Sequence, residues 1–184
     1  MDVRLAIQPV LILFSIIASQ VAQASHDEGR LFIDWPSGWE YREPTRDDGV
    51  LLLQARQRTT ASQSLTISII DTSRASKEVG PDEAHDLVRR LRDSVQQTAV
   101  EPTIEIRKFG NDGYSFVATD RNHWRGQGGF RQLVEGVSLR SGYLINFTLL
   151  TNEAMSVATQ QILTALERAQ ITIDGAKEAR DFTR

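Results

Sequence analysis

The residues best suited to molecular recognition lie in one glycine-rich stretch, "RNHWRGQGGFR", at positions 121–131. Arginine and tryptophan are among the side chains most enriched at the energetic centres of protein interfaces. In a chain of net charge −3, this local group of cations predicts contact with a protein or an anionic ligand. The alternative is an exposed hairpin whose tryptophan folds back on the sheet. The candidate contact residues are Arg121, His123, Trp124, Arg125 and Arg131, with Trp35 as a separate aromatic candidate.

Two further tryptophans flank a Pro-Ser-Gly turn in "RLFIDWPSGWEYRE", residues 30–43. Large aromatic side chains beside a turn usually anchor it by burying their surface. We therefore expect Trp39, together with Phe32, to pack under the edge of the sheet. Trp35 is the contact candidate, because an exposed aromatic side chain at this position would form half of an interaction patch.

The sequence contains no recognisable pattern for catalysis. A hydrolase of the G-x-S-x-G type requires that motif, and the chain has none. The histidines His26, His85 and His123 are spread over a predicted tail, a helix and a loop. The chain also has no cysteine, which excludes thiol chemistry. We expect no enzymatic activity, and a hydrolase is the less favoured alternative.

Metal-binding patterns are equally weak, since neither H-E-x-x-H nor H-x-H occurs. A processed N-terminus with Ser25 and His26 would chelate copper only loosely. A calcium loop at 120–129 has oxygen donors at Asp120 and Asn122 but lacks the closing glutamate. We therefore expect no metal and no other cofactor.

The first 24 residues have the pattern of a secretory signal peptide. A short segment with Arg4 precedes the apolar run "VLILFSIIA" at 10–18, and Ala22 and Ala24 occupy the small-residue positions of a cleavage site. A spanning helix needs about 20 apolar residues, so this run is too short. We expect cleavage after Ala24, with an uncleaved anchor as the alternative. The predicted organisation is a signal peptide at 1–24, a flexible tail at 25–29, one domain at 30–173 and a polar tail at 174–184.

Charge and size limit the class of partner. The mildly acidic chain has no basic face of the kind that binds nucleic acid by displacing counterions. A chain of 184 residues that loses residues 1–24 is long enough to form one domain, which buries roughly 70% of the surface exposed by its unfolded form. Such a domain is stable without disulfides, which agrees with the lack of cysteine in a chain bound for an oxidising compartment.

Seven extended segments are predicted from short apolar and alternating runs. The clearest is "SLTISIID", in which Leu65, Ile67 and Ile69 share one face. Short connections between the later segments favour an antiparallel meander, because a parallel crossover needs a dozen or more residues. The expected strands are 30–35, 50–57, 64–71, 102–109, 113–120, 130–139 and 142–151, with a short extended piece at 171–173.

Two amphipathic helices are predicted, at 81–99 and 152–169. Pro81 suits the first helical position, and Thr151 or Asn152 is expected to cap the second helix. Each helix has one apolar stripe, to which Met155 contributes in the second. The predicted fold is α+β: an α/β/α sandwich around a mainly antiparallel sheet of about six to seven strands.

The order of elements resembles the PsbP-like superfamily over roughly residues 30–171. The sharpest part of the resemblance is "F-x-x-x-P-x-G-W" at Phe32, Pro36, Gly38 and Trp39, followed by "LLLQARQ", "SLTISII", a helix, a four-strand meander and a long helix. This resemblance implies an α/β/α sandwich that binds other proteins rather than catalysing a reaction. The cysteine of lipoprotein members is absent, and the metal-binding residues of photosynthetic members have no matching positions.

These observations predict an exported, non-enzymatic domain of the periplasm or the extracellular space. The expected partner is a protein of the bacterial envelope, bound through the 121–131 segment. The alternative is a carrier of a small apolar or anionic ligand, held between the sheet and a helix. We expect no nucleic-acid partner and no stable membrane insertion after cleavage of the leader.

Overall fold

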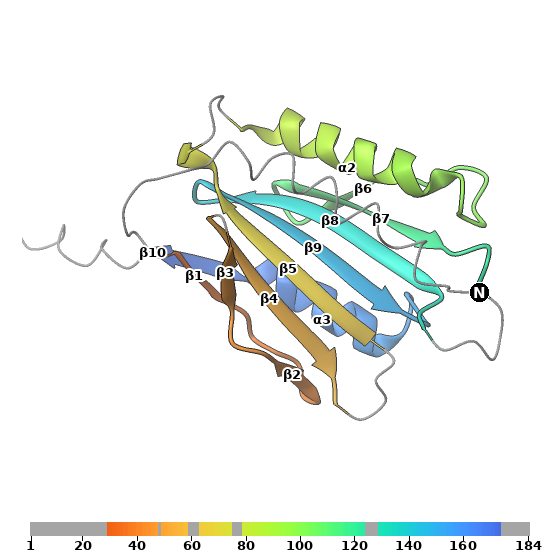
Figure 1. The fold of residues 1–184 in the computed structure, drawn as a ribbon, viewed down its shortest axis with the longest axis horizontal. Coiled ribbons are helices and arrows are strands. Elements are labelled where there is room, and N and C mark those ends of the chain that lie inside the picture. The colour runs from red at the N-terminus through yellow and green to blue at the C-terminus, as the bar shows by residue number, and fades with distance from the viewer. Residues whose placement is uncertain (1–28, 48, 59–62, 75–78, 124–128, 174–184) are drawn as a thin grey trace, which may run out of the picture.

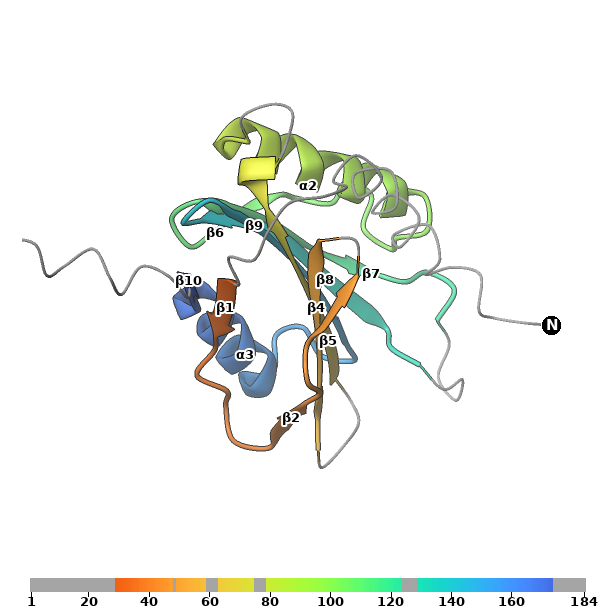
Figure 2. The same cartoon turned by 60° about the vertical axis from the view of Figure 1, so that its left-hand side comes forward.

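The computed structural model describes residues 29–47, 49–58, 63–74, 79–123 and 129–173. Within them, two α-helices cover opposite faces of one antiparallel sheet (Figures 1 and 2). The predicted α+β class is therefore confirmed. The sheet is larger than expected, because eight strands take part in it over the described residues.

The strands follow the order β2-β4-β5-β9-β8-β7-β6 across the sheet, and β3 pairs with β4 beside β2. The predicted meander is confirmed, since β6, β7, β8 and β9 are neighbours in chain order. Strand β5 then pairs with β9, which joins the first hairpin to the meander. The strands are β2 (Trp39–Tyr41), β3 (Thr45–Asp47), β4 (Val50–Gln57), β5 (Gln63–Asp71), β6 (Arg107–Phe109), β7 (Gly113–Thr119), β8 (Gln132–Arg140) and β9 (Tyr143–Thr151).

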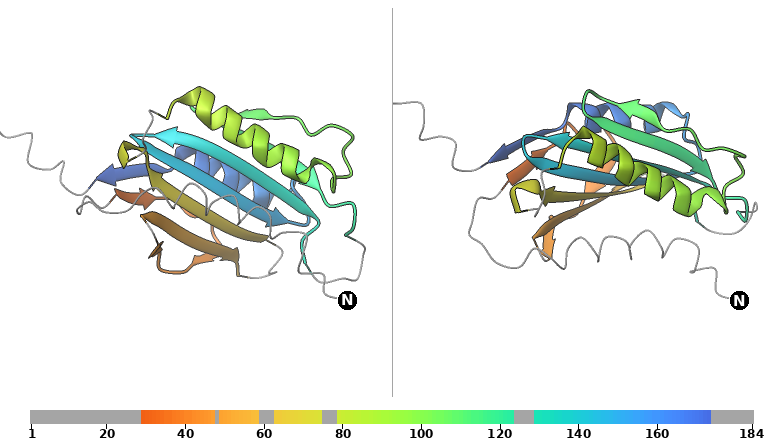
Figure 3. Two further views of the ribbon diagram at one scale, coloured as in Figure 1. Left: turned by 45° about the horizontal axis from the view of Figure 1, so that its top comes forward. Right: turned by 90° about the horizontal axis from the view of Figure 1, so that it is seen from above.

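The first and last strands form a separate pair. Strand β1 (Gly29–Phe32) is shorter than the predicted strand 30–35 and pairs with β10 (Gln170–Ile173) rather than with the main sheet. The extended piece expected at 171–173 is thus confirmed. Figure 3 shows this pair at the end of the molecule opposite the C-terminal end of β7.

Helix α2 (Pro81–Gln96) begins at the predicted residue and ends three residues before the predicted end. Proline at its first position has no N–H to leave unpaired, and the side chain of Glu83 accepts a hydrogen bond from the N–H of Gly80 at 3.0 Å. One apolar stripe of this helix packs on the sheet, as its amphipathic pattern predicted. The buried residues are Ala84, Leu87, Val88 and Leu91.

Helix α3 (Val157–Arg168) begins five residues later than predicted, and neither Thr151 nor Asn152 caps it. Ser156 is the N-cap, and its hydroxyl accepts a hydrogen bond from the N–H of Thr159 at 3.2 Å. Thr151 still belongs to β9, and its side chain accepts from the N–H of Glu153 at 3.1 Å. Met155 therefore lies before the helix, 81% exposed, and not in an apolar stripe.

Two hydrophobic clusters fill the spaces between the sheet and the helices. One lies under α3 and contains Trp39, as predicted, together with Phe147 and Ile162. The other lies under α2 and contains Phe116 and Val137. Phe32 was expected in the core, but its side chain is 55% exposed. The predicted strand at 102–109 is reduced to β6, since only its last three residues pair with β7.

Candidate functional site

The connection between β7 and β8 carries the residues that the sequence singles out, and its two ends are joined by hydrogen bonds. The N–H of Asp120 donates to the carbonyl of Arg131 at 2.9 Å. The N–H of Arg131 in turn donates to Oδ1 of Asn152, also at 2.9 Å. We call Asp120, Arg121, Arg131 and Gln132 the hairpin base. It brings β7, β8 and the segment after β9 together at one end of the sheet.

Arg121 ties the hairpin base to the segment that follows α2. Its backbone N–H donates to the carbonyl of Thr98 at 2.9 Å, and its guanidinium donates to the carbonyl of Ala99 at 2.6 Å. The N–H of Val100 donates to the carbonyl of Thr119 at 2.8 Å. Arg121 is exposed, but its guanidinium is engaged with the protein's own backbone. It acts as an anchor of the hairpin as well as a surface cation.

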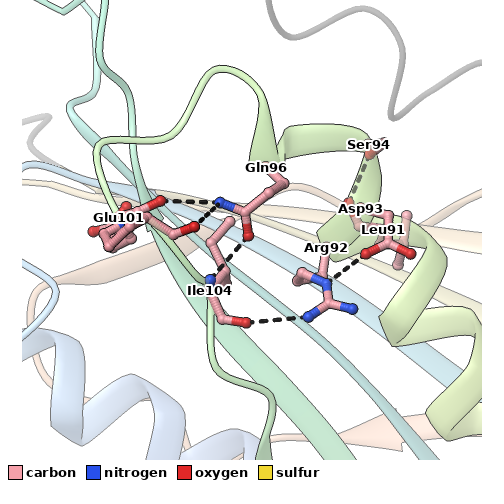
Figure 4. A network of polar contacts seen from close by, with 8 residues as sticks. Leu91, Arg92, Asp93, Ser94, Gln96, Glu101 and Ile104 are labelled. Atoms are coloured by element: carbon pink, nitrogen blue, oxygen red, sulfur yellow. Dashed lines mark hydrogen bonds and ion pairs between the residues drawn. The ribbon is translucent and has the colours of Figure 1, made fainter.

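A polar network holds this post-helix segment in place (Figure 4). The side chain of Gln96 accepts from the N–H of Ile104 and donates to the carbonyl of Glu101, both at 2.9 Å. The carboxylate of Glu101 accepts from the N–H of Thr119 at 2.9 Å. Burial acts to raise the pKa of Glu101, but the hydrogen bonds from Thr119 and the charge of Arg131 outweigh it and hold this pKa below its usual range.

Gln132 fixes the other side of the hairpin base. The N–H of Ala154 donates to its Oε1 at 2.6 Å, which orders the segment between β9 and α3. Two exposed apolar side chains lie in this segment and at the start of α3, namely Met155, 81% exposed, and Val157, 74% exposed. Val100, on the α2 side, is 54% exposed. Thus three of the six large hydrophobic side chains that are exposed in the described residues flank the hairpin base.

The structure divides the predicted contact residues. Arg121 and Arg131 are exposed at the hairpin base, and His123 beside it is half-buried. Trp124 and Arg125 lie outside the described residues. Because Arg121 bonds inward and Arg131 lies near the carboxylate of Glu101, the described part of this surface is not a strong cationic patch. Its exposed apolar side chains are the more distinctive feature.

Trp35 lies apart from this surface. Its ring is half-buried, stacked on Tyr41 with centroids 5.3 Å apart, and its centroid is 6.4 Å from that of Trp39. Strand β2, against which it packs, is separated from β8 by β4, β5 and β9. At the usual spacing of neighbouring strands, four steps across the sheet amount to about 19 Å. Trp35 and the hairpin base therefore do not form one patch.

Sequence reasoning missed one unusual group, the side chain of Glu135 in the middle of β8, which is 1% exposed. The hydroxyl of Thr148 donates to its Oε2 at 2.9 Å. In the orientation that satisfies its hydrogen bonds, the Asn146 amide donates to Oε1 of Glu135 at 3.3 Å. Burial raises the pKa of Glu135 to about 8, against the opposing effect of these two hydrogen bonds. The signal in the sequence was a single carboxylate inside "QLVEGVSL", a run that is apolar on both faces.

The described residues contain no group of three or more histidine, aspartate or glutamate side chains placed to hold a metal ion. His85 packs its ring against that of Tyr114, with centroids 4.7 Å apart.

No helix within the described ranges has the length and apolar character needed to cross a membrane.

Comparisons with known proteins find a likeness of fold. No protein-family model matches the chain, and no curated protein sequence matches it. Among solved structures, cyanobacterial PsbP (CyanoP) from Synechocystis sp. PCC 6803 aligns with 82% of this chain and 96% of its own, at 16% identity and a TM-score of 0.44. A protein from Bacteroides thetaiotaomicron VPI-5482 aligns with 77% of this chain at 10% identity and a TM-score of 0.44, and this match spans 45% of that protein. The predicted resemblance to PsbP-like proteins is confirmed as a likeness of fold, and these similarities carry no statement about function.

Proposed function

We propose that this chain is an exported, non-enzymatic domain that binds a protein partner of the bacterial envelope through the hairpin end of its sheet. The observation that carries this proposal is the hairpin base, which joins three chain segments and is flanked by the exposed side chains of Val100, Met155 and Val157. Exposed apolar side chains on a firmly held surface are typical of interaction sites. Trp124 and Arg125, which belong to the same connection in the sequence, are of the residue types that contribute most at such sites.

Rigidity supports this proposal. A surface held in its bound conformation loses less conformational entropy when a partner binds. Here Arg121, Gln132 and Asn152 each make a hydrogen bond that fixes the hairpin base before any partner is present. The described part of the chain offers no comparable feature that favours the small-ligand carrier or a hydrolase.

Affinity capture from an envelope fraction tests the proposed contact. The Trp124→Ala and Arg125→Ala variants should each weaken capture of the partner at least about tenfold, as expected for interface hot spots. Arg89→Ala serves as the matched control, because Arg89 is an exposed arginine on α2 that pairs with Asp86 of the same helix. Capture that is unchanged in both hairpin variants, with folding intact by thermal denaturation, would exclude this contact site.

Export is tested separately. Mass spectrometry of the protein recovered from the envelope should show a chain that begins at Ser25. A protein that keeps residues 1–24 and remains in the cytoplasm would contradict this part of the proposal, whatever the outcome of the capture experiment.

A further inference from the structure

A carboxyl group that the proposed contact surface does not use is buried at the centre of the sheet. Glu135 lies directly opposite Phe116 of β7 and Thr148 of β9. A buried carboxylate normally requires a cation or several hydrogen-bond donors to offset its lost hydration. Glu135 has two neutral donors, the hydroxyl of Thr148 and the amide of Asn146. These two neutral donors offset the lost hydration incompletely, and burial therefore favours the protonated, neutral form of the side chain.

Helix α2 covers this part of the sheet. Phe116 and Val137, which are neighbours of Glu135 on the same face, pack in the cluster that contains Leu87, Val88 and Leu91 of the helix. The helix also follows β7 along its length, because the ring of His85 packs on Tyr114 and Ala99 bridges to Asp120. Figure 2 shows α2 over β6, β7 and β8, whereas β4 and β5 lie on the side of the sheet's strand order that the helix does not cover. Glu135 therefore lies beneath a helix held to the sheet by apolar packing.

The ionisable groups around Glu135 are engaged elsewhere. The side of α2 that meets the sheet is apolar, and β9 presents only Asn146 and Thr148 to the carboxyl. No charged side chain of the described residues contributes to the raised pKa of Glu135, on which burial, Thr148 and Asn146 act. Several ionisable side chains of the neighbouring elements have other contacts: Glu83 with Gly80, His85 with Tyr114, Arg92 with Ile104 and Asp93, Arg89 with Asp86, Lys108 with Tyr114, Arg107 with Glu105, and Arg140 with Ser138 and Ala169.

We propose that Glu135 makes α2 a pH-sensitive cover, which stays packed on β7 and β8 while the carboxyl is protonated and loosens when it ionises. An ionised carboxylate needs water, and Thr148, whose hydroxyl donates to Glu135, is itself only half-buried. The C-terminal end of α2 remains tied to Glu101 and Ile104 through the side chain of Gln96. This behaviour goes beyond the proposed function and does not depend on it.

Hydrogen exchange on the purified chain tests this proposal. After correction for the intrinsic effect of pH, the amides of α2 should lose about tenfold or more of their protection between pH 6.5 and pH 9. They should be less protected than those of β5 and β9 at every pH, because α2 opens without unfolding of the sheet. The Glu135→Gln variant, which has the shape of the neutral carboxyl and does not ionise, should show no such loss. The His85→Gln control should behave like the unaltered protein.

Three results would overturn the proposal: an unaltered protein that keeps α2 protected at pH 9, a Glu135→Gln variant that loses protection to the same extent, or an α2 that is as strongly protected at pH 9 as β5 and β9. If Glu135→Gln does not fold, Thr148→Val decides the question. This variant removes a donor that favours the ionised carboxyl. The loss of protection should then begin at higher pH, and an unchanged midpoint would overturn the proposal.

Discussion

A single side chain at the centre of the sheet, that of Glu135, makes the stability of the whole domain depend on pH. Glu135 sits where an apolar side chain would bury without cost, and its pKa of about 8 is well above that of a glutamate in an unfolded chain, about 4.3. The folded state therefore holds this proton over a pH range in which the unfolded state has released it. Stability that depends on the proton is complete below the unfolded pKa and is lost as pH rises through the folded pKa.

The first prediction concerns this proton. The free energy of unfolding of the unaltered protein should fall between about pH 4.5 and pH 8, with a contribution from Glu135 of up to about 1.4 kcal/mol for each pKa unit. Urea denaturation at pH 5, 6.5 and 8 measures this slope. The Glu135→Gln variant should have a smaller slope over the same range. Equal slopes in the two proteins would show that Glu135 is ionised in the folded state.

The second prediction concerns Gly136, the residue after this glutamate. A Cβ atom built on Gly136 overlaps the ring of Phe147, which packs across the sheet on the α3 side. Gly136→Ala should destabilise the domain by about 1–3 kcal/mol through overpacking. In a Phe147→Leu background the same change should cost less, because the smaller side chain leaves room. A cost that is equal in both backgrounds, measured by denaturant titration, would contradict this account of the glycine.

At the scale of elements, the last side chain of α2 holds the segment that follows the helix in place. Gln96 satisfies the N–H of Ile104 and the carbonyl of Glu101 in a segment that has no regular structure. Gln96→Ala should cost about 1–3 kcal/mol, since it leaves a partly buried backbone donor unpaired. The neighbouring Gln97→Ala, at an exposed position, is the control and should change the free energy of unfolding by less than about 0.5 kcal/mol. Equal effects of the two substitutions would show that the network adds no stability.

The turn between β8 and β9 contains two residues with positive φ, Ser141 at 49° and Gly142 at 80°. This conformation suits an Asn-Gly pair in a two-residue hairpin, and serine adopts it at some cost. Ser141→Asn should therefore raise the free energy of unfolding by about 0.5–1 kcal/mol, and Gly142→Ala should lower it by a similar amount. Thermal denaturation measures both changes. A destabilising effect of Ser141→Asn would contradict the assigned turn geometry.

Elements with a local signal could be predicted from the sequence. The start of α2 follows from Pro81 and the acidic residues after it, and β5 follows from strict alternation of apolar and polar side chains. The start of α3 was misjudged because Met155 continues the helical spacing of apolar residues, whereas Thr151 remains paired in β9. The spacing of apolar residues in the sequence could not show that the side chain of Met155 is exposed.

Features that depend on distant segments could not be predicted. The pairing of β1 with β10 joins the two ends of the domain, and nothing in either segment specifies its partner. The burial of Glu135 depends on α2, which packs on β8 from a separate part of the chain. Likewise, the surface around the hairpin base arises because Arg121, Gln132 and Asn152 connect three segments. The residue types between 121 and 131 predicted a contact site. They gave no indication of the exposed apolar side chains that lie beside it.

At the scale of the whole molecule, the two ends of the domain have different roles in this account. The described chain enters at β1 and leaves at β10, where Gly29 pairs with Ile173. Helix α3 separates this end from the hairpin base, and a helix of 12 residues spans about 18 Å. The β1–β10 pair and the proposed contact surface therefore lie toward opposite ends of α3.

Site-specific photocrosslinking in cells that produce the protein tests the central claim, that the hairpin end is the partner-binding surface. A photoreactive amino acid is placed at Met155, beside the hairpin base, or at Phe32, an exposed apolar position on β1 at the opposite end. We predict a crosslinked envelope protein from position 155 that is lost in the Trp124→Ala background, and none of that size from position 32. The same product from position 32, or none from position 155, would contradict the claim.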